Sequence, residues 1–243
     1  MAIPEYEFNL IVADNITPKV KHFSIKHHGD DNFNFVPGQF ISIVFEHAQK
    51  ILKRSYSIAN SPNRDNMIEF SAAYVADGPG TQYLFHLKPG DKLKIQGPFG
   101  RLILKDEAVK RLILVGTSTG ITPYRSMLPS LVKRLQQEED LEVHVIQGVA
   151  HPEDILFEAD FLNFCTHHAR AHFMAALSQV TASTQAHHCP GRVQVALSNI
   201  QPNPATDMVY LCGNPQMIDD CTALLQDTGF SIQQIIREKY ISR

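Results

Sequence analysis

RLILVGTSTGITPYRSM, residues Arg111 to Met127, is the stretch that decides the fold of the second half of the chain. Leu112 to Val115 is a short apolar run of strand-forming residues, and Gly116 to Gly120 is a turn of small residues. Thr122 to Leu135 then carries apolar residues at helical spacing. The pattern predicts a strand, a tight turn and a helix in direct succession.

The start of this helix is a candidate phosphate site. Bare amides and the positive end of the helix dipole favour an anion there, and small turn residues let a phosphate approach the backbone. Pro123 suits the first helical turn, and we expect Thr122 to cap the helix. The spacing of Gly116, Ser118 and Gly120 does not meet the G-x-G-x-x-G fingerprint. Glycines that only turn the chain therefore explain the stretch equally well.

Composition excludes several classes of protein. The 243 residues, 44% of them apolar, provide a core for two compact domains or one large one. The net charge of −3 and the absence of a Lys/Arg cluster argue against nucleic-acid binding. No apolar run approaches the ~20 residues of a membrane span, and the start MAIPEYEFNL lacks a secretion signal, so we expect a cytoplasmic protein.

The four cysteines predict neither a disulfide framework nor a cysteine-ligated iron–sulfur cluster. They fall only in the second half of the chain and form no C-x-x-C pair.

The first hundred residues have the pattern of a β domain. Short apolar or alternating runs are separated by turns rich in Gly, Pro, Asn and Asp, which predicts a barrel or a sandwich. One short helix is expected at Thr81–Leu87. The expected strands are Tyr6–Val12, Val20–Ile25, Phe40–Phe45, Arg54–Ile58, Ile68–Val75 and Lys92–Ile95.

After Arg111 strands and helices alternate, which predicts a parallel sheet with crossover helices. We place the domain boundary in the charged stretch Lys105–Lys110, giving domains 1–105 and 106–243. The expected strands are Arg111–Val115, Leu141–Gln147, Ala171–Leu177 and Met208–Cys212. The expected helices are Thr122–Gln137, Asp154–Phe164, Gly191–Ile200 and Pro215–Asp227.

Arg54-Ser55-Tyr56-Ser57 lies in an expected strand. Residues two apart share one face, about 6.6–6.8 Å from each other, so Arg54 and Tyr56 can engage one elongated ligand. An arginine fork suits a phosphate, and a tyrosine ring suits a flat heterocycle. An exposed strand face with an ordinary Arg and Tyr remains the alternative.

Two further turns precede helices. Gly78-Pro79-Gly80-Thr81 has Thr81 as the expected cap, and its amides and hydroxyl suit a pyrophosphate, although a plain turn explains it equally well. Leu211-Cys212-Gly213-Asn214-Pro215 follows an expected parallel strand at the sheet edge where open sheets bind ligands. Cys212 as a small buried filler is the alternative.

Taken together and in this order, these pieces resemble the ferredoxin–NADP reductase family. The resemblance implies an antiparallel flavin-binding barrel followed by an α/β nucleotide-binding domain, with FAD and NAD(P)H as cofactors and hydride passing between them in the cleft between the domains. The matching pieces are RSYS at 54–57, GPGTQYL at 78–84, LKPGDKLKIQGPFG at 87–100, GTSTGITPY at 116–124, CGNP at 212–215 and EKY at 238–240.

The resemblance assigns the flavin site to residues of the first domain. Arg54 is expected to hold the FAD pyrophosphate, and Tyr56 to stack on the isoalloxazine. Ser57 is expected near flavin N5, a role that requires a local bend because strict strand alternation turns it away from Tyr56. Thr81 and the turn Gly78–Gly80 are expected to complete the pyrophosphate site.

The resemblance assigns the nicotinamide nucleotide to the second domain. The turn Gly116–Gly120, which includes Thr117, is expected to meet its pyrophosphate. Cys212, Gly213 and Glu238 are expected to border the nicotinamide, with Ser57, Cys212 and Glu238 as the catalytic set.

Tyr240 is expected to cover the other flavin face. Ile241, Ser242 and Arg243 follow it, whereas some members end at the aromatic residue, so its displacement by nicotinamide is expected to be altered.

Departures from the family pattern bear on the nicotinamide nucleotide. Ser118 stands where the family usually has a glycine. A serine there would be strained if the backbone is left-handed. Ala150-His151 and Ser178-Gln179 lack the arginines that NADPH-preferring members usually carry. We expect a slight preference for NADH, because a 2′-phosphate would lose its charged hydrogen bonds. His151 or Arg170 could compensate.

A histidine-rich region allows a metal site as an alternative interpretation. Cys165, His167, His168 and His172 lie close in sequence, and His187-His188-Cys189 follows. Metal sites use such spacings, but paired histidines are often only solvated, and no metal is expected.

The sequence leaves the electron acceptor open. Ferredoxin, flavodoxin, an oxygenase component and free flavin are all compatible with a monomeric enzyme that passes electrons on one at a time. A reductase using flavin as a substrate and a non-catalytic flavin-binding subunit are the alternatives.

Overall fold

The structure is a computed structural model that describes residues 3–29, 32–62, 65–183 and 185–240. The chain divides into two compact units. The first contains residues up to Leu104 together with Thr122–Met127, and the second contains Lys105–Ile121 and the residues from Leu128 onward.

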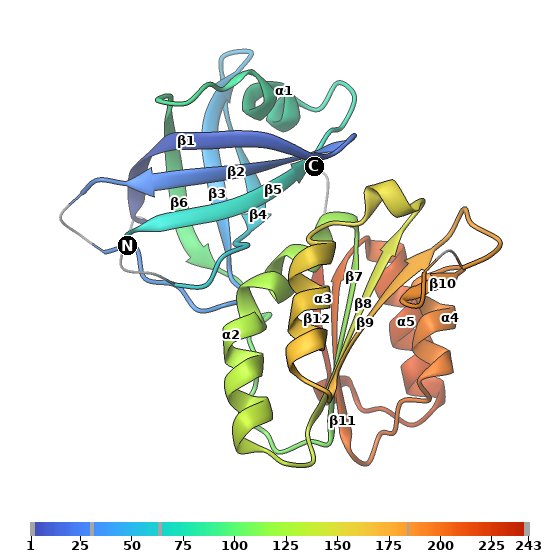
Figure 1. Ribbon diagram of the computed structural model, residues 1–243. Coiled ribbons are helices and arrows are strands. Elements are labelled where there is room, and N and C mark those ends of the chain that lie inside the picture. Colours follow the sequence, from blue (N-terminus) through green and yellow to red (C-terminus); the bar gives the residue numbers. More distant parts are fainter. Residues whose placement is uncertain (1–2, 30–31, 63–64, 184, 241–243) are drawn as a thin grey trace. The chain divides into compact units, whose positions relative to one another are not determined.

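The first unit is a six-stranded antiparallel sheet with strand order β4-β3-β6-β1-β2-β5. A short helix, α1 (Pro79–His86), accompanies the strands (Figure 1). The strands are β1 (Glu5–Thr17), β2 (Val20–His27), β3 (Phe40–His47), β4 (Lys50–Ser57), β5 (Met67–Ala73) and β6 (Lys92–Phe99). The sequence therefore predicted every strand of this unit, with ends that differ by a few residues.

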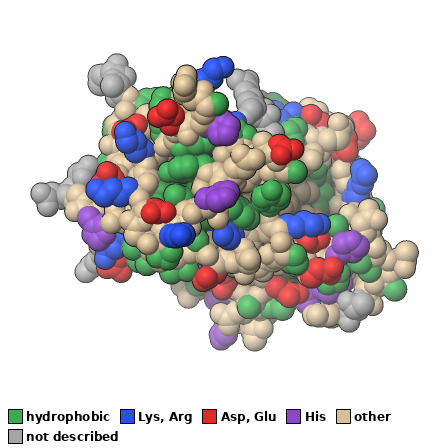
Figure 2. Space-filling model, turned by 90° about the horizontal axis from the view of Figure 1, so that it is seen from above, with side chains coloured by type: hydrophobic (Ala, Val, Ile, Leu, Met, Phe, Trp, Pro, Cys, Tyr) green, Lys and Arg blue, Asp and Glu red, His purple; other side chains and the backbone are tan. Residues whose placement is uncertain are grey.

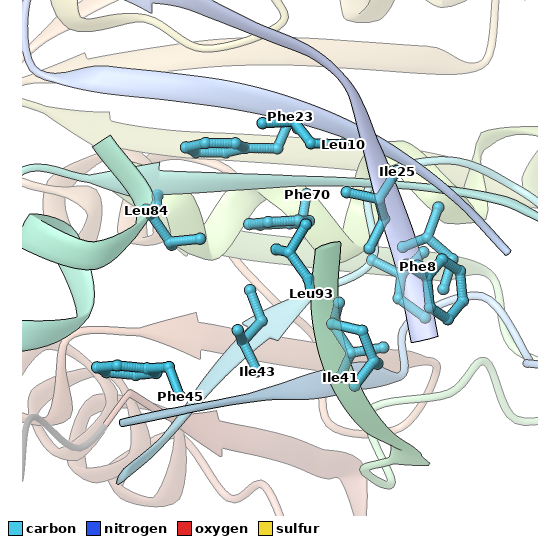
Figure 3. Close-up of a cluster of buried hydrophobic side chains, with 14 of the residues drawn as sticks. Phe8, Leu10, Phe23, Ile25, Ile41, Ile43, Phe45, Phe70, Leu84 and Leu93 are labelled. Carbon is cyan, nitrogen blue, oxygen red and sulfur yellow. The ribbon is translucent and has the colours of Figure 1, made fainter. Parts of the chain in front are cut away.

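The two end strands of this order meet, which closes the sheet as the barrel prediction requires. Ile58, directly after β4, forms an antiparallel bridge with Phe70 of β5. The alternating side chains that point inward form one core, in which Phe23 and Phe70 stack with ring centroids 4.9 Å apart (Figure 3). Burial of these aromatic and aliphatic side chains is the main stabilising term for the unit.

The second unit is a six-stranded parallel sheet with order β10-β9-β8-β7-β11-β12. Helices α2 and α3 lie on one face and α4 and α5 on the other (Figure 1). The strands are β7 (Arg111–Thr117), β8 (Glu142–Val149), β9 (Ala171–Leu177), β10 (His188–Pro190), β11 (Asp207–Gly213) and β12 (Ile235–Lys239). The helices are α2 (Thr122–Gln137), α3 (Glu158–His167), α4 (Val193–Asn199) and α5 (Pro215–Asp227).

Three predictions for the second unit were wrong or incomplete. The helix expected from Asp154 begins at Glu158, because Pro152–Asp154 forms a separate 3₁₀ turn and Phe157 takes a left-handed conformation. The strands β10 and β12 were not predicted. β10 has three residues and β12 has five, so both are too short to show a clear period.

The surface shows no separation of charge by sign on the face drawn in Figure 2, where acidic and basic side chains are interspersed. Among the described residues, no helix is both long and apolar enough to cross a membrane.

An ion-pair network lies on the first unit. The Arg125 guanidinium is 2.6 Å from Glu69 Oε2, and His22 Nε2 is 3.3 Å from the same oxygen. The hydrogen bond from His22, with the charge and hydrogen bond of Arg125, lowers the pKa of Glu69 to about 2, against burial that raises it. The charged carboxylate is thus the form that the folded state prefers.

Glu69→Gln is expected to lower the free energy of unfolding by about 1–2 kcal/mol at pH 7, after allowing for partial exposure. Because the folded pKa is depressed, the carboxylate stabilises fully above about pH 4.5, and that stability is lost as the pH falls towards 2. Urea unfolding should show a smaller difference in the free energy of unfolding between Glu69→Gln and wild type at pH 3 than at pH 7. Glu7→Gln, which removes an exposed pair with Lys92, is the control, and an equal loss in both variants would contradict the prediction.

Candidate cofactor sites

The turn after β7 is pressed against the end of β11. A Cβ on Gly120 would lie 2.3 Å from the carbonyl oxygen of Cys212, and one on Gly116 would lie 2.7 Å from the carbonyl group of Gly120. Neither position therefore admits a side chain. Only backbone can occupy this part of the turn, as a close approach by a phosphate requires.

The position of this turn follows from the sheet topology. From β7 the chain runs outward through β8, β9 and β10, and then returns to the other side of β7 as β11. The strand order thus reverses between β7 and β11. Open α/β sheets bind ligands at the carboxyl ends of the strands at such a switch point.

The turns after β7 and β11 are also joined by a hydrogen bond. The Asn214 N–H donates to Thr117 Oγ1 at 3.0 Å. Asn214 Oδ1 in turn accepts from the N–H groups of Gln216 and Met217 and so caps α5. This cap was not among the predicted features, although an Asn directly before Pro215 is a sequence signal for it.

The turn after β7 differs from the sequence predictions at the start of α2. Ser118 has φ of 49°, so it occupies the left-handed position that a glycine would take without strain. Thr122 does not cap α2: Ile121 is the N-cap, and Thr122 lies inside the first turn. The cap prediction was wrong because the preceding residues Ser118–Ile121 continue as a 3₁₀ turn into the helix.

Cys212, Glu238 and Tyr240 come together in the second unit. Cys212 of β11 pairs with Glu238 of β12, and the Tyr240 N–H donates to the Gly213 carbonyl oxygen at 2.8 Å. Tyr240 Oη donates to the Thr119 carbonyl oxygen at 3.3 Å. The sequence did not predict that contact. Ile241, Ser242 and Arg243, on which we based an expectation for Tyr240, lie outside the described residues.

Cys212 is fully buried. Burial and the nearby Glu238 carboxylate raise the pKa of its thiol well above the usual value, and a hydrogen bond with Tyr240 opposes them only in part. The thiol therefore stays protonated at neutral pH. A buried, protonated thiol packs as a small apolar side chain and is not suited to nucleophilic attack, which needs the thiolate.

Arg54 and Tyr56 share one face of β4, as the strand alternation predicted. Both side chains converge on Gly80 of α1, where an added Cβ would lie 2.8 Å from Arg54 Cγ and 3.2 Å from Tyr56 Oη. Burial raises the pKa of Tyr56 to about 12, and the charge of Arg54 opposes this. The first unit thus presents a cation and a neutral aromatic ring beside a helix start at which Gly78 and Gly80 contribute no side chain.

Thr81 is not the helix cap that the sequence predicted. α1 begins at Pro79 with Gly78 as its N-cap. The Thr81 hydroxyl is 2.9 Å from the Val75 carbonyl oxygen and 3.0 Å from that of Gly78, so it fixes the turn before the helix. Prolines favour the first helical turn, which moves the start two residues earlier than expected.

Ser57 is buried at the end of β4. Its position next to Tyr56 in a strand places the two side chains on opposite faces, as expected.

The two units match two described families. Residues 7–103 match the model of the oxidoreductase FAD-binding domain, and residues 114–223 match that of the oxidoreductase NAD-binding domain. These matches agree with the geometry, because Arg54 and Tyr56 lie in the first range and the turn at the switch point lies in the second.

Relatives cover most of the chain. The ferredoxin–NADP reductase of Azotobacter vinelandii is 30% identical over 230 residues, which is 86% of this chain and 85% of that protein. Reductase component 1 of a terephthalate 1,2-dioxygenase from a Comamonas species is 28% identical over 200 residues, 82% of this chain and 57% of that protein. The crystal structure of a ferredoxin NADP⁺ reductase from Neisseria gonorrhoeae with bound FAD and NADP shares the fold, with a TM-score of 0.83, 22% identity and coverage of 98% and 99%.

Fold, sites and relatives together define a flavoprotein oxidoreductase with FAD and NAD(P) as its cofactors. The chain belongs to the ferredoxin–NADP reductase family.

Gly120→Ala is expected to destabilise the second unit by about 1–3 kcal/mol, because the added methyl group must displace the backbone of β11. NAD(P)H affinity should fall as well. Ser118→Gly lies in the same turn and is the control: it relieves a left-handed serine, so stability should stay equal or rise by up to about 1 kcal/mol. Urea unfolding and a nucleotide titration measure both effects. A Gly120→Ala variant as stable as wild type would contradict the predicted clash with the β11 backbone.

Proposed function

We propose that this reductase transfers hydride between NAD(P)H and FAD and passes electrons singly to an acceptor protein of the ferredoxin, flavodoxin or oxygenase-component class, or to free flavin. The convergence of Arg54 and Tyr56 on Gly80 carries this proposal. It offers a charged fork and an aromatic ring to one ligand, as a flavin dinucleotide needs. When bound, the flavin supplies the conversion between a two-electron hydride and single electrons.

In the first domain, which we propose ends at residue 105, Arg54 holds the FAD pyrophosphate. Gly78–Gly80 and the turn fixed by Thr81 leave the helix start open to the same phosphates. Tyr56 packs its ring on the isoalloxazine. Its phenol stays protonated over the physiological range, because burial raises its pKa to about 12. Ser57, the last residue of β4, borders the reacting edge of the flavin in this proposal.

In the second domain, the backbone of Gly116, Thr117 and Gly120 holds the pyrophosphate of the nicotinamide nucleotide. Cys212, Gly213 and Glu238 border the nicotinamide ring and set its position. The protonated Cys212 thiol is neutral. It therefore adds bulk beside the ring without forming an ion pair with the positively charged oxidised nicotinamide. Tyr240 is the aromatic cover for the flavin.

We also propose a preference for NADH over NADPH. The segment after β8 carries Ala150 and His151, and the Asp154 carboxylate accepts from the His151 N–H at 3.3 Å, which places a negative group there. Arg170 offers no substitute cation, because its guanidinium donates to the carbonyl oxygens of Leu135, Glu138 and Leu141. A 2′-phosphate would therefore lack a charged partner from these residues.

Arg54→Ala is expected to weaken FAD binding by about 1.5–3 kcal/mol, the scale of a hydrogen bond to a charged group. Flavin content after purification and the FAD dissociation constant measure the loss. Lys53→Ala removes a cation from the opposite face of the same strand and should retain flavin. Full flavin occupancy in Arg54→Ala would remove this residue from the site.

Cys212→Ala is expected to keep its flavin and to slow flavin reduction by NADH about 10–100-fold, because a lost packing contact loosens the nicotinamide. Stopped-flow absorbance under anaerobic conditions gives the rate. Cys221→Ala, which also removes a buried free thiol, is the matched control and should react at the wild-type rate. An undiminished rate in Cys212→Ala would mean that the thiol does not border the reacting ring.

A further inference from the structure

Two histidines and a glutamate converge at the outer edge of the parallel sheet. Glu158 is the first residue of α3, His188 is the first residue of the edge strand β10, and His187 precedes it. Nε2 of His187 lies 2.7 Å from Glu158 Oε1, and Nε2 of His188 lies 3.7 Å from the same oxygen. The donor atoms of all three side chains lie within 4.8 Å of one another.

These separations suit a small divalent ion. In a tetrahedral zinc site with bonds of about 2.0–2.2 Å, neighbouring donor atoms are about 3.4 Å apart. The two measured distances lie on either side of that value. The imidazole rings of His187 and His188 are nearly perpendicular, at 75°, so they do not form a parallel stack. At a common spacing of about 3.4 Å all three side chains would bond to one ion.

The ligands are held by their surroundings. The His188 side chain is 1% exposed, and the His187 ring packs on Phe173, which itself stacks on Phe161 of α3. Phe157, directly before Glu158, has φ of 56°, a costly conformation for a bulky residue, and it sets the point at which α3 begins. Glu158 remains 35% exposed, which leaves a route for an ion and a coordination position for water.

The other histidine cluster fits an ion less well. Glu142, His144 and His172 also lie within reach of one another, but the two imidazole rings stack at 27° with centroids 4.6 Å apart. Stacked rings direct their lone pairs side by side, so one ion cannot lie in line with both.

The grouping that the sequence suggested does not form a site among the residues that the structure describes. Cys165, His167 and His168 enter neither cluster, and the His167 ring bonds to the Asn163 carbonyl oxygen. Cys189 lies on the other face of β10 and packs against the hydrophobic core of the second unit.

We propose that Glu158, His187 and His188 bind one divalent transition-metal ion of the zinc class, which joins the start of β10 to the start of α3. Two imidazoles and one carboxylate suit Zn²⁺, whereas Mg²⁺ and Ca²⁺ prefer oxygen ligands. The ion is structural, and the proposal is independent of the hydride-transfer assignment.

The test uses the untagged full-length flavoprotein, stripped with a chelator and titrated with Zn²⁺ against a competing chromophoric chelator. One ion per chain is expected, with a rise in the melting temperature. His187→Gln and Glu158→Gln should each weaken binding by at least the roughly 10–100-fold that loss of an outer-shell partner costs, and should abolish the rise. Both residues are partly exposed, so these variants should fold, which circular dichroism and flavin content will verify.

His167→Ala, which removes an exposed histidine of α3, and the double variant His144→Ala/His172→Ala are the controls and should bind zinc as wild type does. Loss of zinc binding in the double variant would place the site at the stacked cluster. Wild-type affinity in folded His187→Gln or Glu158→Gln, or no stoichiometric binding by the wild type, would overturn the proposal.

Discussion

The close approach of Gly120 to the end of β11 is the constraint on which the proposed nucleotide site depends. The backbone of the β7 turn lies so near the Cys212 carbonyl group that no side chain fits between them. The parallel pairing of β7 with β11 imposes this contact at the point where the strand order reverses. One packing contact therefore leaves the helix start bare and places Cys212 beside it, at the edge where parallel sheets bind ligands.

The proposed flavin site depends on a glycine in the same way. Gly80 lets α1 approach Arg54 and Tyr56 closely enough for both to face one helix start. Here the closed antiparallel sheet fixes the alternation that puts the two residues on one face. In both units a glycine removes side-chain bulk at a helix start, and the proposed phosphate contacts depend on that missing bulk.

Features with a local cause could be predicted from the sequence. The bounds of α2, α5 and β9 agree with their predicted ranges. Apolar periodicity lies within each segment, and Pro123 and Pro215 mark the first turns of the two helices. Features that depend on pairing could not be predicted. β12 acquires its strand conformation from β11, and Glu158 meets His187 across 29 residues of sequence. His167 and His172, which are close in sequence, separate: His167 of α3 bonds to the Asn163 carbonyl oxygen, whereas His172 of β9 stacks on His144.

Anaerobic mixing of the purified wild-type protein with NADH and, separately, with NADPH tests the central claim most directly. The flavin absorbance should bleach in a single turnover with NADH and more slowly with NADPH at equal concentration. A protein that binds FAD but is bleached by neither nucleotide would contradict the account.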